Sequence, residues 1–255
     1  MKISIITVTF NSIKNIEQCI NSVRNQSYNN IEHIIIDGAS KDNTVAFLKS
    51  KLNKFTKILS EEDKGIYDAM NKGIKLASGD LIAFLNSDDF YAHDNVVTKI
   101  TNVFKNEPTI DACYSDLIYI DKVNISKTIR YLKSCEFKQG LFMKGWCPPH
   151  PTFVVRRSVF ERYGEFDLNY PLASDFDLMI RFLEIHRIKS TYIPEVLVHM
   201  RIGGATNKNL KNILQQNLEI LNIFKKNNLP LNVYKFFFNK IIYRFNQFFL
   251  NSKFK

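Results

Sequence analysis

Two adjacent carboxylates, Asp88 and Asp89, follow a short and strongly apolar segment at 81–85. Adjacent carboxylates at the end of a buried strand repel each other, and burying them unpaired is costly. A hard divalent cation such as Mg²⁺ or Mn²⁺ removes this conflict, because it takes carboxylate oxygens and leaves positions for phosphate oxygens. The alternative is that either carboxylate caps the helix expected near 95–104. The pair therefore predicts a metal site or a helix cap, and its surroundings must decide between them.

The surrounding elements favour the metal. Over the first 90 residues, apolar strands alternate with segments of helical periodicity, which predicts a parallel sheet covered by helices on both faces. The strands are expected at 3–10, 31–37, 57–60 and 81–85. Ligands bind beyond the carboxyl ends of such strands, where Asn11, Asp37 and Asp88 are expected to converge. The chain has no glycine-rich phosphate-binding loop, so a metal would neutralise the phosphates of a bound nucleotide.

The remainder of the chain is less regular. A small antiparallel sheet is expected from strands at 114–120, 128–132 and 152–156, followed by a helix at 175–184 and short strands at 190–194 and 196–201. Pro230 separates two further helices at 207–228 and 231–250.

Composition excludes several classes of protein. The 255 residues contain four cysteines without metal-binding spacing and no apolar stretch long enough for a membrane span, which indicates reduced thiols and a cytoplasmic location. The net charge of +10 is concentrated in the tail, because nine basic residues and only one acid, Glu219, follow residue 206. A nearly neutral body is not typical of a nucleic-acid-binding protein, so no nucleic-acid partner is expected. The oligomeric state stays open.

Several motifs, taken in order, resemble a known family. MKISIITVTFN, IIIDGASKDNT and DKGIYDAMNKGIKLASGDLIAFLNSDD resemble the family-two glycosyltransferases, and HPTFVVRRSVF, ASDFDLMIR and VHMRIGGAT extend the resemblance to about residue 206. The wording KGIYDAMNKGI is similar to bacterial enzymes that assemble surface polysaccharides such as lipopolysaccharide and capsule. The resemblance implies an α/β protein of the GT-A (Rossmann-like) fold, with a mostly parallel sheet, a small antiparallel sheet and a C-terminal helical extension.

The resemblance also implies a division of labour along the chain. Residues 1–206 would form the glycosyltransferase domain, with a nucleotide-sugar-binding half at 1–110 and an acceptor-binding half at 111–206, and residues 207–255 a basic amphipathic tail. The reaction would transfer a hexosyl or N-acetylhexosaminyl group, with inversion, from a nucleoside-diphosphate sugar to a hydroxyl of a glycan or lipid-linked glycan. A carboxylate at Asp37 favours a UDP-linked donor.

Site residues follow from the same resemblance. Asp89 would bind the divalent metal (Mn²⁺ or Mg²⁺) directly, and His199 would approach the metal or the diphosphate. Asp88 would contact the ribose or a metal-bound water. The implied donor-binding residues are Thr7, Thr9, Phe10, Asn11, Asp37, Asp68, Asn71, Ser87 and Asp88. Two of these roles have plain alternatives: a helix cap for Asp37 and an exposed strand end for His199.

Asp175 matches the general base of the family, which removes the proton from the acceptor hydroxyl. It could instead cap its helix, and Asp177 is a competing carboxylate that should point away if Asp175 faces the cleft. Trp146 and His150 are expected on the acceptor side, although a lone Trp packs in a core as often as it stacks on a sugar.

The chain departs from the family pattern at two positions. Ser174 stands where relatives often have Glu, which leaves the assignment of the base intact. Met70 stands where many relatives have Arg, so phosphate neutralisation would fall to Lys64, Lys72 or another base.

The segment 231–250 predicts a basic amphipathic helix rich in Phe, of the type that lies in a membrane interface. Such a helix would place the protein peripherally on the cytoplasmic face of the inner membrane, close to a lipid-linked acceptor. The alternative is a helix docked on the catalytic domain or on another subunit. A non-catalytic nucleotide-sugar- or glycan-binding relative is the alternative to an enzyme.

Overall fold

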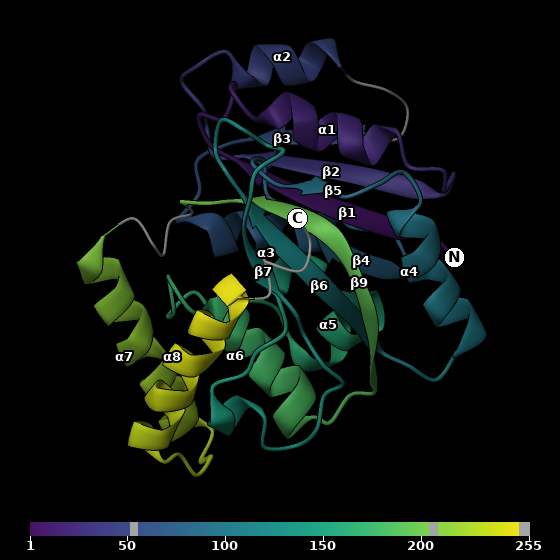
Figure 1. Ribbon diagram of the computed structural model, residues 1–255. Helices are drawn as coiled ribbons and strands as arrows, with labels where there is room; N and C mark the ends of the chain where they lie inside the picture. Colours follow the sequence, from purple (N-terminus) through teal and green to yellow (C-terminus); the bar gives the residue numbers. More distant parts are fainter. Residues whose placement is uncertain (52–55, 204–208, 250–255) are drawn as a thin grey trace.

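The computed structural model describes residues 1–51, 56–203 and 209–249. Within these residues one nine-stranded sheet runs through the molecule, with the strand order β3-β2-β1-β4-β8-β6-β9-β5 and β7 paired to β6 (Figure 1). The strands are β1 (Ile3–Thr9), β2 (Ile31–Asp37), β3 (Thr56–Ser60), β4 (Leu81–Phe84), β5 (Phe90–Tyr91), β6 (Ala112–Ile120), β7 (Thr128–Leu132), β8 (Val154–Arg156) and β9 (Ser190–Arg201). The first four strands are parallel, as predicted.

Alternating side chains of β1 explain how the sheet holds helices on both faces. Ile3 and Ile5 pack with Cys19 of α1 (Ile16–Arg24), whereas Ile6 packs with Ile74 of α3 (Ile66–Leu76). This alternation of period two within a buried strand is what a sheet covered on both faces requires.

The other helices extend these two layers. They are α2 (Thr44–Ser50), α4 (Val96–Asn106), α5 (Arg157–Tyr163), α6 (Ser174–Ile180), α7 (Leu210–Lys226) and α8 (Val233–Phe249). A π-helical turn, Arg181–Ile185, continues α6, and short 3₁₀ turns occur at Phe142–Lys144 and His150–Thr152.

The separate antiparallel sheet that the sequence predicted does not form. The three-residue strand β8 pairs antiparallel with both β4 and β6, so it joins the two halves into one sheet. The two strands expected at 190–194 and 196–201 are a single strand, β9, which runs parallel to β6 through register shifts around Asp116. The site can therefore draw residues from both halves of one continuous sheet.

The C-terminal helices dock on the same core as the sheet. Phe224 of α7 lies between Phe176 of α6 and Phe236 of α8, with ring-centroid distances of 5.7 and 5.5 Å. Phe224 and Phe236 are both almost completely buried. The expected tail is thus partly packed on the core of the sheet domain, which corresponds to the docked-helix alternative. No helix among the described residues is long and apolar enough to cross a membrane.

Candidate active site

A cavity of about 790 Å³ opens at the edge of the sheet where β1 and β4 end. Its walls come from the loop after β1, the loop after β4, the start of α3, the turn at His150, the start of α6, the end of β9, and the inner side of β7 and α8. Among the lining residues are Thr9, Phe10, Asn11, Met70, Asn86, Ser87, Asp88, Tyr119, Arg130, His150, Asp175, Arg201, Arg244 and Phe248.

Four buried polar atoms on these walls have no hydrogen-bond partner in the described part of the chain. They are Thr9 Oγ1, Asn86 Oδ1, His150 Nε2 and Arg201 Nε. An unsatisfied buried polar atom costs roughly 1–3 kcal/mol. Four such atoms around one cavity indicate that the cavity is built for a polar ligand that would satisfy them.

The loop after β1 forms one end of the cavity. Asn11 takes a left-handed backbone conformation (φ 49°), its N–H donates to Ser40 Oγ at 2.7 Å, and its Oδ1 accepts from the N–H of Lys41 at 2.8 Å. These bonds hold Phe10 outward, with 60% of its side chain exposed beside the cavity. An exposed aromatic ring at this end can stack on a nucleobase.

Ser87 is also placed as expected, on the cavity wall, where its hydroxyl pairs with that of Ser12 at 2.9 Å.

Two expected donor-binding residues on the first two strands do not reach the cavity. Thr7 is fully buried, and its hydroxyl pairs with His33 Nε2 at 2.9 Å. Asp37 is also fully buried, and its carboxylate accepts from the N–H of Ser40 at 2.9 Å and from the hydroxyl of Ser60 at 2.7 Å. Both residues therefore support the loops that shape the cavity and do not line it.

The Asp88–Asp89 pair is split between the cavity and the interior. Asp88 lines the cavity, whereas Asp89 is fully buried, accepting from Asn86 Nδ2 at 3.2 Å and from the N–H of Arg201 at 3.3 Å. Burial raises the pKa of both carboxyl groups, and the negative charge of Asp88 raises that of Asp89 further. The repulsion anticipated from the sequence is present, but Asp88 is the carboxylate that faces a ligand.

The donor set suits a hard cation. Asp88, the neighbouring Asp89 and the unpaired Asn86 Oδ1 offer oxygen atoms, and oxygen ligands are those that Mg²⁺ and Mn²⁺ prefer. Among the described residues there is no group of three His, Cys, Asp or Glu side chains arranged to hold a metal. The protein would thus supply only part of a coordination shell, and phosphate oxygens of a ligand would complete it.

His199 does not join this shell. Its ring packs edge-on against Phe90 with centroids 5.1 Å apart, and it is absent from the cavity wall. Burial and the neighbouring His93 lower its pKa. In β9 the residue that does reach the pair is Arg201, two positions further on.

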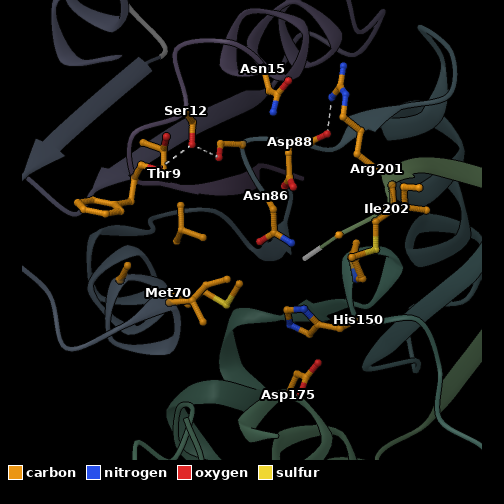
Figure 2. Close-up of a pocket in the computed structure, with 18 of the residues that line it drawn as sticks. Thr9, Ser12, Asn15, Met70, Asn86, Asp88, His150, Asp175, Arg201 and Ile202 are labelled. Carbon is orange, nitrogen blue, oxygen red and sulfur yellow. Dashed lines mark hydrogen bonds between the residues drawn. The ribbon is translucent and has the colours of Figure 1, made fainter. Parts of the chain in front are cut away.

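Arg201 was missed as a site residue, although it lies within the VHMRIGGAT motif. It is 6% exposed, and its guanidinium donates to the carbonyl oxygen of Asp88 and to Gln18 Oε1, while its backbone N–H donates to Asp89. Figure 2 shows the bond to Asp88 at the upper side of the cavity. Arg201 fixes the Asp88–Asp89 turn and adds a positive charge beside it.

Asp175 lines the opposite side of the cavity at the start of α6. Its Oδ1 accepts from the hydroxyl of Tyr67 at 2.9 Å and from the N–H of Phe176 at 2.8 Å. No hydrogen bond to Oδ2 is found within the described residues. In Figure 2, Asn86 and His150 lie between Asp88 and Asp175. Two carboxylates therefore face one cavity from opposite walls, one of them oriented by a buried phenol.

Burial, together with hydrogen bonding to Asp175, raises the pKa of Tyr67 well above its ordinary value, so the phenol stays protonated and donates at neutral pH.

Asp177 points away from the cavity, as its helical spacing from Asp175 predicts. It is fully buried and accepts from Arg181 Nε at 2.7 Å.

His150 lines the cavity as expected. Its ring stacks on Phe84 with centroids 5.4 Å apart, and burial lowers its pKa, although Asp175 partly opposes the shift. The imidazole is therefore neutral near pH 7.

Trp146 is not on the acceptor side. It is 7% exposed and packs among Tyr114, Phe137 and Phe142, with ring centroids 5.7 to 5.9 Å apart. The prediction that Trp146 stacks on a sugar is therefore wrong, and the alternative, that it packs in the core, is correct.

The helix α3 contributes apolar surface in place of charge. Met70 lines the cavity, but Asn71 points into the core, where it holds both the N–H and the carbonyl oxygen of Phe166 at 3.0 and 2.9 Å. Asp68 caps the start of the helix by accepting from the N–H of Lys64 at 2.9 Å. Asp68 and Asn71 therefore shape α3 and do not line the main cavity.

The comparisons with known proteins show which family the chain belongs to. The family model for Glycosyl transferase family 2 matches residues 4–164. The uncharacterized glycosyltransferase Rv1514c of Mycobacterium tuberculosis is 33% identical over 184 residues, which are 70% of this chain and 68% of that protein. The PGL/p-HBAD biosynthesis glycosyltransferase Rv2957 of the same species is 29% identical over 80% of this chain and 78% of its own length.

Solved structures share the fold. Staphylococcus aureus TarS 1–349 in complex with UDP-GlcNAc superposes with a TM-score of 0.60 at 18% identity, covering 87% of this chain and 67% of that one. The mannosyltransferase PcManGT of Pyrobaculum calidifontis, solved with GDP-Man and Mn²⁺, gives 0.64 at 16% identity, covering 88% and 67%. The chain spans only 40% of a longer TarS chain. On this sequence and this fold, the chain belongs to glycosyl transferase family 2 and has the GT-A fold.

Proposed function

We propose that this protein transfers a hexosyl or N-acetylhexosaminyl group from a nucleoside-diphosphate sugar, UDP-linked, to a hydroxyl of a glycan or lipid-linked glycan, with inversion. The observation that carries the proposal is that Asp88 and Asp175 face one cavity from opposite walls. TarS and PcManGT were solved with nucleotide sugars, which supports a nucleotide sugar as the donor here.

Each wall has a separate task in this proposal. Phe10 and the loop at Asn11 would hold the nucleobase, and Asp88 with Asn86 would bind a divalent metal, which stabilises the charge of the leaving nucleoside diphosphate. Asp175 Oδ2 removes the proton from the acceptor hydroxyl as that oxygen attacks the anomeric carbon. The bond between that carbon and the diphosphate oxygen breaks in the same displacement, which inverts the anomeric configuration.

The fixed position of Asp175 supports its role as base. Tyr67 and the N–H of Phe176 both bond to Oδ1, so the carboxylate cannot rotate freely and Oδ2 stays available. The neutral His150 beside it can donate or accept a hydrogen bond at its unpaired Nε2. These groups orient an acceptor hydroxyl without competing for its proton.

The experiment is metal-dependent nucleotide release from a panel of nucleotide sugars, with Asp88→Asn and Asp175→Asn as variants. Asp88→Asn is expected to lose metal-dependent UDP binding. Asp175→Asn is expected to keep that binding and to lose about 10²-fold or more in rate, the usual contribution of a general base. Asp94→Asn, an exposed carboxylate outside the cavity, is the matched control. Nucleotide binding without release from any donor would favour a non-catalytic binder.

We also propose that α7 and α8 attach the protein peripherally to the cytoplasmic face of a membrane. On α8 a single face carries Tyr234, Phe238, Ile241 and Phe245, which are between 62% and 91% exposed. Their spacing of four and three residues keeps them on that face. Three leucines of α7, at 210, 214 and 218, are at least 62% exposed. Isolated exposed apolar residues are ordinary, but two such rows on neighbouring helices indicate an interaction surface.

The docked side of α8 explains why these side chains face outward. Phe236 packs into the core and Lys240 Nζ donates to Asn217 of α7 at 2.9 Å, so the opposite face is turned away from the domain. Aromatic residues and a surplus of Lys and Arg in the tail suit an anionic lipid surface.

The test is co-sedimentation with anionic liposomes of the full chain and of Phe238→Asp/Ile241→Asp/Phe245→Asp. Truncation is a poor test, because it would remove Phe236 from the core. The triple variant is expected to lose at least tenfold in lipid partitioning. Unchanged partitioning, or a dimer that the variant dissociates, would assign this face to a protein partner.

A further inference from the structure

One wall of the cavity is basic, and the proposed function gives no role to most of its positive charge. Besides Arg201, the lining includes Arg130 of β7 and Arg244 of α8. The opposite helix, α3, offers Met70 where many relatives have Arg. Lys72 is turned away from the cavity, with Nζ 2.8 Å from Glu61 Oε1 and 2.6 Å from the carbonyl oxygen of Glu62. The lining also includes Lys14 in the loop after β1, and Arg130 and Arg244 are the positive charges of the cavity on the β7–α8 side.

Arg130 and Arg244 line the same wall of the cavity, together with the aromatic residues Tyr119 and Phe248. The guanidinium carbon of Arg130 lies 3.7 Å from the ring centroid of Tyr119 and 5.9 Å from that of Phe248. Burial, and the positive charge of Arg244, lower the pKa of Arg130. Guanidinium groups stay charged in proteins, so this wall presents two positive charges to the cavity.

The docking of α8 is what brings Arg244 to the cavity. Gly145 has a positive φ of 81°, and a Cβ there would lie 3.0 Å from the carbonyl oxygen of Phe236 and 3.2 Å from the N–H nitrogen of Lys240. A glycine at this point lets the α8 backbone approach the loop directly. Because Arg244 follows Lys240 by one turn, this contact sets its position along the wall.

We propose that Arg130 and Arg244 form a phosphate-binding site on this wall, with α8 as part of the active site. The proposal rests on the proposed function, since the phosphate would belong to the substrate. A planar guanidinium group donates two parallel hydrogen bonds to two oxygens of one phosphate. Two guanidinium groups together match the charge of a doubly charged phosphate. The phosphate has two sources, the diphosphate of the donor or a phosphate of a lipid-linked acceptor. The aromatic rings of Tyr119 and Phe248 beside the pair would cover the less polar part of either molecule.

The experiment compares the full chain with Arg130→Gln, Arg244→Gln and the double variant, using three probes: UDP with Mn²⁺, inorganic pyrophosphate, and phosphatidylcholine vesicles with or without phosphatidic acid. Lys49→Gln is the control, because it removes one exposed positive charge on α2, far along the chain from this wall. Arg130→Lys/Arg244→Lys keeps the charge and removes the guanidinium geometry. Thermal unfolding of each variant checks that the fold is intact.

We expect pyrophosphate binding to weaken about tenfold for each Gln variant, the range of one charged hydrogen bond, and less for the Lys double variant. Weaker UDP binding assigns the site to the donor. Unchanged UDP binding with a loss of the preference for phosphatidic acid assigns it to the acceptor. If the arginine variants bind all three probes as tightly as Lys49→Gln does, the inference is overturned. It is also overturned if the folded wild type binds none of the probes.

Failure of this inference and failure of the proposed function give different results. If the Gln variants bind pyrophosphate as the wild type does and the wild type still releases nucleotide, the phosphate site is refuted and the proposed transferase activity is not. If pyrophosphate binding depends on Arg130 and Arg244 but no donor releases its nucleotide, the transferase activity is refuted and the phosphate site is not.

Discussion

Replacing Tyr67 by Phe removes one hydroxyl and leaves the ring that stacks on Phe166 at 5.4 Å. That hydroxyl donates to Asp175 Oδ1 at 2.9 Å. Burial raises the pKa of Tyr67 well above its ordinary value, so the phenol is a donor at every pH at which the enzyme would work. The substitution therefore withdraws a single hydrogen bond that fixes the orientation of the Asp175 carboxylate.

The size of the effect follows from the bond. A hydrogen bond to a charged group contributes about 1.5 to 3 kcal/mol, and about 1.4 kcal/mol corresponds to a tenfold change in rate. Because this bond holds Oδ1 in place and keeps Oδ2 directed to the acceptor, its loss is expected to lower kcat/KM by about 10- to 100-fold.

The assay is kcat/KM for metal-dependent nucleotide release at neutral pH. Tyr131→Phe is the matched control, because it removes a phenol that donates to Asp116, a buried carboxylate that does not line the cavity. It is expected to lower stability and leave kcat/KM unchanged. A Tyr67→Phe variant with the kcat/KM of the wild type would refute the role of this phenol in positioning Asp175.

Three further outcomes are expected. Burial raises the pKa of Asp88 and Asp89, and the charge of Asp88 raises that of Asp89 further, so protons compete with the metal. Mn²⁺ affinity should therefore rise with pH through that raised range, with proton release visible by calorimetry in buffers of different ionisation enthalpy, and pH-independent affinity would contradict the site. In metal-free protein the same shift means that the folded state holds protons more tightly, so Asp89→Asn should unfold at a higher urea concentration than the wild type at neutral pH, and an equal or lower midpoint would contradict the repulsion. Asn71→Ala should cost about 2 to 5 kcal/mol of unfolding free energy, because it leaves two buried backbone groups of Phe166 unpaired, and a loss below about 1 kcal/mol would show that they find other partners.

The parallel half of the fold was predictable because it is encoded locally. Apolar strands and amphipathic helices have distinct periods, and the residues after β1 and β4 must meet at one edge of a parallel sheet. Asn11 and Asp88 reach the cavity for that reason. The joined sheet was not predictable, because a three-residue strand such as β8 has no periodicity of its own and depends on the pairing of both neighbours.

The same distinction separates the site residues. Asp37 and Asn71 stand at the right places in their motifs, but hydrogen bonds from Ser60 and to Phe166 use their polar atoms inside the protein. Those partners lie 23 and 95 residues away along the chain, so spacing within a motif does not reveal them. Arg130 and Arg244 belong to no recognised motif: the pairing of β7 with β6 brings Arg130 to the cavity, and the docking of α8 brings Arg244 there.

The central claim is that Asp88 holds the donor through a metal and that Asp175 performs the proton transfer. The most direct measurement is titration of UDP with and without Mn²⁺, paired with nucleotide release, for the wild type, Asp88→Asn and Asp175→Asn. We predict that Asp88→Asn loses the Mn²⁺-dependent part of binding, whereas Asp175→Asn binds as the wild type does and releases almost no nucleotide. Full nucleotide release by Asp175→Asn, or Mn²⁺-dependent binding retained by Asp88→Asn, would contradict the claim.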